Sequence, residues 1–162
     1  EYHKFDGNVS QRIVCPYYLK QFRKRWYLIA KDSKDGSVKS FGLDRMEKLT
    51  QTKTSFKLLK KDDPKHLFEN VIGLFEKDGV PTKIEIWSEP YNANYMRTLP
   101  LHKSQKELGQ KDGGYIFELT IVPNFEFYQE ILRMSYNVKI LSPESVKNQM
   151  AKTLDDIRNY YE

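Results

Sequence analysis

The run Arg25-Trp26-Tyr27-Leu28-Ile29-Ala30, followed by Ser-Val-Lys-Ser-Phe-Gly-Leu at residues 37–43, predicts a β-hairpin in the first half of the chain. Both runs are rich in β-branched and aromatic residues, and residues 32–36 between them, Asp-Ser-Lys-Asp-Gly, have the composition of a hairpin loop. We pair residues whose numbers sum to 68, which places Gly42 opposite Trp26. A slip of one residue would exchange the faces, and the sequence leaves both registers open.

In this register, one face of the predicted hairpin mixes cations with aromatic and aliphatic side chains: Arg25, Tyr27, Ile29, Lys39, Phe41 and Leu43. The chain has a formal net charge of +5, from 27 basic and 22 acidic residues. The stretch from Tyr17 to Arg45 holds eight basic and three acidic residues, so it alone carries this excess. A local basic excess indicates an anionic partner, and the alternative is a solvated basic hairpin without one.

Short elements flank this hairpin. Asp6-Gly7-Asn8 predicts a turn, and residues 9–15 predict a strand that Pro16 either ends or places at a sheet edge. A basic connector covers residues 53–61, and Asp63-Pro64 then opens a helix, with Asp63 as its N-cap. Apolar residues follow at helical spacing: Leu67, Phe68, Val71, Ile72 and Phe75.

The second half predicts alternating strands and helices. The expected strands cover residues 83–88, 115–122 and 137–141. Helices are expected at residues 90–96, after the cap Asn124, and after Ser142-Pro143. A polar segment covers residues 101–111 and precedes a turn at 112–114. The apolar stripe of the last helix comprises Val146, Met150, Leu154, Ile157 and Tyr161. This order is typical of a ferredoxin-like α+β fold.

Composition and motifs argue against catalysis. The three histidines are far apart, and the sequence has no Cys/His metal spacing, glycine-rich phosphate loop or nucleophile elbow. The single cysteine, Cys15, lies in an apolar stretch and is interpreted as a buried thiol, and a lone cysteine fits a reducing cytoplasm. No apolar run approaches the roughly 20 residues that span a bilayer. We therefore predict a cytoplasmic protein that is not an enzyme and has neither metal nor cofactor.

Residues 14–46 resemble the WYL domain. The family pattern is a Pro followed by a Leu, a Trp-Tyr-Leu triplet and a Phe-x-Leu-Asp-Arg-Ile block, which correspond here to Pro16, Leu19, Trp26-Tyr27-Leu28 and residues 41–46. The block ends in Met46 instead of Ile, a mild change. Gly42 stands where relatives often have Arg, which removes one cation from the usual set. The second half resembles the extension that follows many WYL domains, through residues 100–105, 112–113, 124–126, 131–132 and 138–143.

The resemblance implies an α+β protein in three parts. These are a WYL domain with a small Sm-like β-barrel over residues 1–60, a linker helix over 61–80, and a ferredoxin-like extension over 81–162. It also implies a bacterial transcription regulator with a helix-turn-helix or winged-helix DNA-binding domain ahead of residue 1, so the chain is interpreted as the carboxy-terminal part of a longer protein.

The resemblance further implies that the barrel binds a negatively charged ligand, either nucleic acid or a nucleotide, and passes the signal to the DNA-binding part. On this basis the predicted ligand-binding residues are Tyr18, Lys20, Arg23, Arg25, Tyr27, Lys39 and Arg45. The cations of Arg25, Lys39 and Arg45 would neutralise phosphates. The two tyrosines would stack on a base or donate a hydrogen bond, with the other two cations at the rim.

Four of these assignments have a structural alternative. For Arg45, the residue on which the family motif centres, it is an ion pair with Asp44 or another carboxylate. For Tyr27 it is core packing, and Trp26 is assigned to the core rather than to the site. Lys20 and Arg23 would otherwise be ordinary surface charges.

The sequence thus favours a ligand-sensing module of a transcription factor, with promoter DNA as an indirect partner and a homodimer as the expected assembly. Two alternatives stay open. One is an oligomerisation module without a ligand. The other is a stand-alone RNA-binding protein of Sm type.

Overall fold

The computed structural model describes residues 1–57, 63–74 and 79–162, which form an α+β fold with several sheets. The chain divides into two compact units. The first comprises residues 1–69 and 73–77, and the second comprises residues 70–72 and 78–162.

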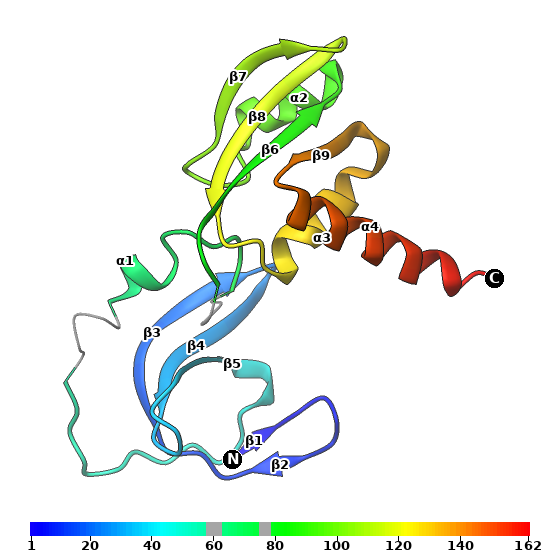
Figure 1. The fold of residues 1–162 in the computed structure, drawn as a ribbon. Helices are drawn as coiled ribbons and strands as arrows, with labels where there is room; N and C mark the ends of the chain where they lie inside the picture. The colour runs from blue at the N-terminus through cyan, green and yellow to red at the C-terminus, as the bar shows by residue number, and fades with distance from the viewer. Residues whose placement is uncertain (58–62, 75–78) are drawn as a thin grey trace. The chain divides into compact units, whose positions relative to one another are not determined.

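The first unit contains two antiparallel sheets (Figure 1). A hairpin joins β1 (Tyr2–His3) to β2 (Val9–Ser10), and a three-stranded sheet has the order β3 (Val14–Phe22), β4 (Arg25–Asp32), β5 (Val38–Gly42). The predicted turn at residues 6–8 and the predicted hairpin are confirmed. An isolated bridge between Tyr2 and Met46 links the first strand to the segment after β5. Within the described residues these pairings do not close into a barrel, so the Sm-like barrel stays a prediction.

The predicted register of the hairpin was wrong by one residue. Tyr27 pairs with Gly42, and Leu28 pairs with Phe41, so paired numbers sum to 69. The physical reason is the small core of this unit, in which buried Tyr2, Ala30 and Phe41 pack with Val14, Leu28 and Met46. The predicted register would have moved Phe41 to the face opposite Leu28 and Ala30.

Trp26 was also assigned wrongly, because 48 % of it is exposed. The pairing of β4 with β5 ends at Tyr27, so Trp26 extends beyond the last residue of β5. Pro16 lies inside β3, an edge strand, beside a register shift between Pro16 and Tyr18. An edge or a bulge is where a strand tolerates a residue without an N–H donor.

The helix predicted after Asp63 is much shorter than expected, because α1 ends after one turn (Pro64–Leu67). The segment beyond it leaves the helical path. The carbonyl of Asn70 accepts a hydrogen bond from the N–H of Val122, and that of Ile72 accepts one from the Asn124 side chain. A continued helix would have turned these carbonyls toward its own backbone. The predicted position of Phe75 lies outside the described residues.

The second unit is a four-stranded antiparallel sheet with helices. Its elements are β6 (Thr82–Ser88), α2 (Pro90–Thr98), β7 (Lys106–Lys111), β8 (Gly114–Ile121), α3 (Phe125–Met134), the short 3₁₀ turn η3 (Ser135–Asn137), β9 (Val138–Ser142) and α4 (Glu144–Asn159). The first unit also has a short 3₁₀ turn, η1 (Leu43–Arg45). The strand order is β7-β8-β6-β9. The strand β7 was missed in the predicted polar segment because all six of its residues are exposed.

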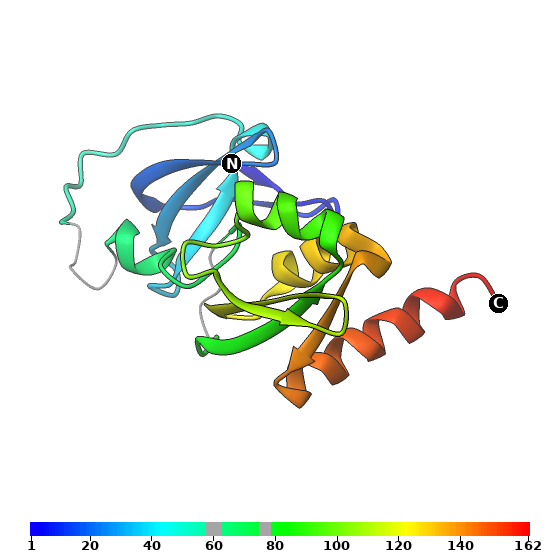
Figure 2. The ribbon, with the colours of Figure 1, turned by 90° about the horizontal axis from the view of Figure 1, so that it is seen from above.

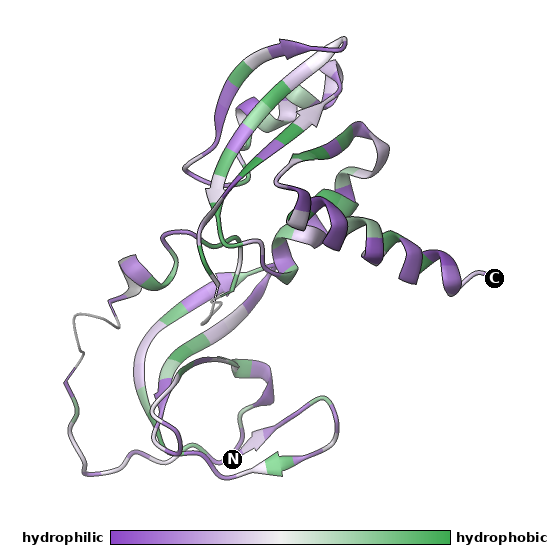
Figure 3. Ribbon diagram, in the orientation of Figure 1, coloured by the Kyte–Doolittle hydropathy of each residue, from purple (hydrophilic) through white to green (hydrophobic). Residues whose placement is uncertain are grey.

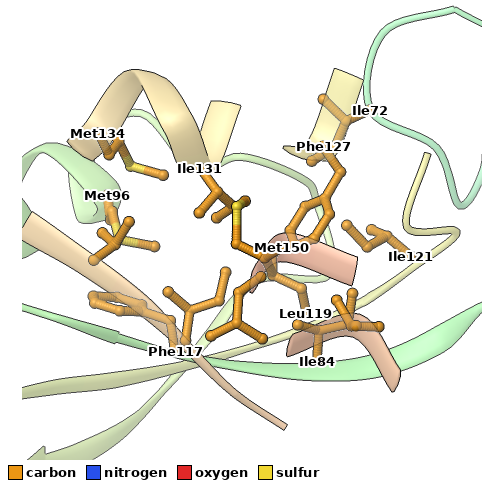
Figure 4. Close-up of a cluster of buried hydrophobic side chains, with 14 of the residues drawn as sticks. Ile72, Ile84, Met96, Phe117, Leu119, Ile121, Phe127, Ile131, Met134 and Met150 are labelled. Atoms are coloured by element: carbon orange, nitrogen blue, oxygen red, sulfur yellow. The ribbon is translucent and has the colours of Figure 1, made fainter. Parts of the chain in front are cut away.

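The core of the second unit lies between one face of this sheet and its helices. Ile84 of β6, and Phe117 and Leu119 of β8, are almost fully buried against Phe127 and its neighbours (Figure 4). Ile86 of β6 is buried in the same cluster. Along β6 and β8 hydrophobic and hydrophilic residues alternate, as a sheet with one covered face requires (Figure 3).

The two long helices of this unit begin differently from each other. Asn124 caps α3 as predicted, its side chain accepting a hydrogen bond from the N–H of Phe127. The last helix was expected after Ser142-Pro143, and Ser142 is the last residue of β9 while Pro143 holds the cap position of α4. The last turns of α4 extend away from the sheet (Figure 2), which leaves Leu154 and Ile157 of its predicted apolar stripe exposed. None of the helices in the described ranges is long and apolar enough to cross a membrane.

Candidate anion-binding face

The structure brings four of the seven predicted ligand-binding residues to one face of the β3-β4-β5 sheet. Lys20 of β3 pairs with Tyr27 of β4, and Tyr18 pairs with Ile29. Directly paired residues of antiparallel strands point to the same face, and residues two apart on one strand do so as well. Tyr18, Lys20, Arg25 and Tyr27 therefore share a surface, which we call the basic-aromatic face.

Tyr18 is the most unusual member of this face. Its hydroxyl group is buried and has no hydrogen-bond partner within the described residues. Burial, and then the negative charge of Asp63, raise the pKa of Tyr18 well above its usual range, so the hydroxyl keeps its proton. An unsatisfied buried hydroxyl costs about 1–3 kcal/mol, so the group is a donor in need of an acceptor.

Lys20 lies beside Tyr18 on the same strand. Its Nζ atom lies 4.1 Å from the centre of the Phe68 ring, and burial lowers the pKa of the ammonium group. The Phe68 ring is its neighbour, and no carboxylate forms a salt bridge with it in the described part of the chain. Lys20 is thus a partly desolvated cation rather than the ordinary surface charge of the alternative interpretation.

The two arginines at the hairpin end are more exposed. Arg25 lies 3.6 Å from the carboxylate of Asp44, a distance and exposure typical of a weak surface pair. Arg23 lies in the tight turn between β3 and β4, where it and Lys24 adopt positive φ angles, and its guanidinium covers the Phe22 ring. Both remain at the rim of the basic-aromatic face.

Lys39 was predicted to neutralise phosphate, but the structure places it on the opposite face, where it already has partners. Its ammonium group binds Asp32 at 2.8 Å and Asp35 at 2.6 Å, and these hydrogen bonds raise its pKa. Asp32 is buried and also binds Arg12 at 2.9 Å. Lys39 is therefore committed to a structural ion network.

The network determines the ionisation of Asp32. Burial alone would raise the pKa of this carboxyl group. Hydrogen bonds from the Lys39 ammonium and the Lys34 N–H, with the charges of Lys39 and Arg12, outweigh burial, and the net pKa is lowered.

Arg45 also lies apart from the basic-aromatic face. Its guanidinium carbon lies 5.1 Å from the centre of the Tyr2 ring and 4.3 Å from that of Phe5, and its Nε has no hydrogen-bond partner in the described ranges. A side chain at Gly42 would start about 3.0 Å from the Arg45 guanidinium and closer still to Asp44, so any larger residue at this position would require both side chains to move. These contacts are not the ion pair of the alternative interpretation, and the phosphate-binding role of Arg45 stays a prediction.

Sequence reasoning missed two features of this unit. Phe68 was assigned only to a helix face, although its ring lies 5.7 Å from that of Tyr18 at an interplanar angle of 83°. The salt bridge of Arg12 to Asp32 joins residues 20 positions apart in the sequence. For the salt bridge, the available signal was Asp32, an acidic residue at the end of a strand with basic residues on either side. Nothing in the sequence indicated the contact of Phe68 with Tyr18.

Other candidate chemistry in this unit is limited. Glu1, His3 and Glu47 bring one nitrogen and two carboxylates within 4.8 Å of one another. Lys48 already donates to both carboxylate oxygens of Glu1, which lowers the pKa of that group together with His3. Cys15 is a free thiol that is half-buried, rather than buried as predicted, at a hollow of about 520 Å³.

Comparisons with known proteins fit this division of the chain. The family model of the WYL domain matches residues 1–51, and that of the WCX domain matches residues 81–158. No curated protein matches the chain in sequence. Among solved structures, proteasome accessory factor B/C (PafBC) of Arthrobacter aurescens is similar over 95 % of this chain, with 19 % identity and a TM-score of 0.38. The match covers 23 % of that protein, so this chain spans about a quarter of its length.

Proposed function

This chain belongs to the WYL-domain transcription regulators, with a WYL domain followed by a WCX domain, and from this premise we propose that its basic-aromatic face binds an anionic ligand with flat rings. The ligand class is single-stranded nucleic acid or a nucleotide. The observation that carries the proposal is the buried hydroxyl of Tyr18, unpartnered among the described residues, next to the partly desolvated ammonium of Lys20.

The chemistry of the face suits both parts of such a ligand. Lys20 and Arg25 supply charge-assisted hydrogen bonds to phosphate, and the hydroxyl of Tyr18 supplies a neutral donor. The ring of Tyr27 offers a surface on which a base stacks, an interaction worth about 1–3 kcal/mol per base. A bound ligand would accept a hydrogen bond from the Tyr18 hydroxyl, and its phosphate would pair with the Lys20 ammonium.

We also propose the finer architecture that the resemblance implies. In the second unit, the element order β6-α2-β7-β8-α3-β9 and the strand order β7-β8-β6-β9 support a ferredoxin-like fold. In the first unit, the bridge between Tyr2 and Met46 supports strands that curl toward an Sm-like barrel.

In the regulator, ligand binding would control a DNA-binding domain encoded ahead of residue 1, and a homodimer would present two such domains to a promoter. Symmetric dimers match the two-fold symmetry of many operators, which is the support for this part of the proposal.

Fluorescence anisotropy of labelled single-stranded DNA and RNA over a salt series tests the proposed site. Lys20→Gln is expected to weaken binding about tenfold and to reduce the salt slope by about 1, as the loss of one phosphate contact requires. Arg25→Gln should act in the same direction. Lys34→Gln, which removes an exposed charge in the loop at the other end of β4, is the matched control and should change little.

Three outcomes separate the candidates. If Arg45→Ala weakens binding while Lys20→Gln does not, the anion binds at the motif arginine instead of the basic-aromatic face. If no strand binds at low salt while the protein dimerises with concentration, the chain is an oligomerisation module. Tight RNA binding that excludes DNA would favour the stand-alone RNA-binding alternative.

A further inference from the structure

One short segment carries residues that belong to both units. Phe68 groups with the first unit, and Asn70 to Ile72 group with the second. Ile72 is part of the buried cluster of the second unit, while Phe68 contacts two members of the basic-aromatic face. Only three residues, 69–71, therefore lie between a contact at the proposed ligand site and a residue of the other core.

In the first unit, Phe68 takes up surface that a ligand would use. The edge-to-face contact of its ring with Tyr18 has a centroid distance of 5.7 Å, and the Lys20 ammonium lies 4.1 Å from its centre. A stacked base makes these same two kinds of contact, an aromatic pair and a cation over a ring. Phe68 thus occupies the position in which a ligand base would make its contacts.

This occupant satisfies the site incompletely. A phenyl ring accepts no strong hydrogen bond, so the Tyr18 hydroxyl stays without a partner in the described residues. It also carries no negative charge, so the burial that lowers the pKa of Lys20 is uncompensated by an anion. A phosphate-bearing ligand provides what Phe68 lacks at both positions.

In the second unit, the far end of the segment is fixed by hydrogen bonds. The carbonyl of Asn70 accepts from the N–H of Val122 at 2.6 Å, and the carbonyl of Ile72 accepts from Nδ2 of Asn124 at 2.9 Å. The other end of the Asn124 side chain caps α3 through the N–H of Phe127. Since each residue spans at most about 3.6 Å, little slack separates Phe68 from these anchors.

We propose that Phe68 is a built-in competitor of the ligand, and that a bound anionic, base-containing ligand displaces it and shifts residues 69–72 against the amino end of α3. This inference rests on the proposed function, because a competitor requires a ligand to displace. Because residues 68–72 are continuous backbone, ligand binding in the first unit would be transmitted along this segment to the second unit.

The test compares the protein with Phe68→Ala, using a fluorescein-labelled oligothymidylate as the probe. Removing the competitor is expected to tighten binding about tenfold, the equivalent of one lost aromatic contact. Phe56→Ala is the matched control, because Phe56 contacts Tyr17 instead of the basic-aromatic face and should leave affinity unchanged. Hydrogen exchange followed by mass spectrometry reports the segment directly.

Exchange is expected to rise in residues 66–69 and to change at Val122 when the oligonucleotide binds. Ligand-free Phe68→Ala should already show the faster exchange in residues 66–69. Equal affinity of the two proteins overturns the competitor while leaving the proposed function standing. Tighter binding without any change at Val122 overturns the route to the second unit. Binding by neither protein overturns the proposed function, and the competitor with it.

Discussion

The two units of this molecule differ in what their interiors contain. The second unit buries a broad apolar cluster from three strands, three helices and the segment at Ile72. In the described residues of the first unit, the small core has three buried members, Tyr2, Ala30 and Phe41, while Ile29 and a charged Asp32 are buried outside this cluster. The first unit also leaves a buried tyrosine hydroxyl and a buried arginine nitrogen without hydrogen-bond partners among the described residues.

This difference separates stability from recognition. Buried apolar area stabilises a fold without requiring a partner, and each fully buried large side chain contributes about 1.5–3 kcal/mol. Unsatisfied polar groups and partly desolvated cations destabilise the free protein and gain most when a ligand arrives. We therefore expect substitutions in the second unit to act on unfolding, and substitutions on the basic-aromatic face to act on binding.

The largest effect is expected from Phe117→Ala, which empties the centre of the second core. Phe117 is 1 % exposed, so the loss should be about 3–5 kcal/mol of the free energy of unfolding. Urea unfolding followed by tryptophan fluorescence measures it, because Trp26 reports the first unit and Trp87 the second. Phe125→Ala is the control, since Phe125 is 69 % exposed.

A Trp87→Phe background then leaves Trp26 as the sole tryptophan and isolates the first unit. If Phe117→Ala shifts the Trp26 transition as much as the Trp87 transition, the units unfold together, and the comparison between them loses its meaning for stability.

The next effect is expected within the first unit, from Asp32→Asn. Removing one partner of a fully buried ion network costs about 3–5 kcal/mol, and the partial exposure of Arg12 and Lys39 reduces this to about 2–3 kcal/mol. The Trp26 transition in urea is the measurement. Asp35→Asn removes an exposed carboxylate from the same lysine and should cost less.

The same carboxylate predicts a pH dependence. The pKa of Asp32 is lowered on folding from its ordinary value of 3.8, so its contribution is present above pH 3.8 and is lost as pH falls through the lower, folded value. Unfolding of the first unit should become easier with acid in the native protein and less so in Asp32→Asn. If the free energy of unfolding falls equally with acid in the native protein and in Asp32→Asn, the ion network of Asp32 does not determine the acid sensitivity.

A smaller effect is expected from Asn124→Ala. This change removes the cap of α3 and the hydrogen bond to the Ile72 carbonyl, for a loss of about 1–2 kcal/mol in the Trp87 transition. Asn159→Ala, at the exposed end of α4, should change little. A loss no larger than that of the control would mean that residues 70–72 are not anchored in the second unit.

What the sequence predicted well was local in character. The hairpin around residues 32–36, the cap at Asn124 and most strands of the second unit follow from turn residues and apolar alternation. The strand β7 was missed because its exposed residues have no apolar alternation. The helix after Asp63 was overextended because helical spacing does not reveal that Asn70 and Ile72 bond to Val122 and Asn124.

The candidate site was only partly predictable for a related reason. Residues two apart on one strand, such as Tyr18 and Lys20, share a face by geometry alone. Whether Lys39 joins them depended on a register that the sequence left open, and its commitment to Asp32 depended on contacts across strands. Arg45 was chosen from a motif, which carries no information on the rings of Tyr2 and Phe5 that it contacts here.

The smallest expected effect, and the sharpest test of the contrast, comes from Tyr18→Phe. It removes only the unpartnered hydroxyl and keeps the ring against Phe68, so the first unit should gain about 1 kcal/mol of unfolding free energy. The same change should weaken oligonucleotide binding severalfold, because the donor for phosphate is gone. Tyr128→Phe is the matched control in the second unit, where a half-buried tyrosine packs against the apolar core. A variant that is more stable and binds less well would show that the hydroxyl is retained for recognition at the expense of stability. Loss of stability in Tyr18→Phe would mean instead that the hydroxyl has a partner in the folded protein, and the proposed donor would have to be sought elsewhere on the basic-aromatic face.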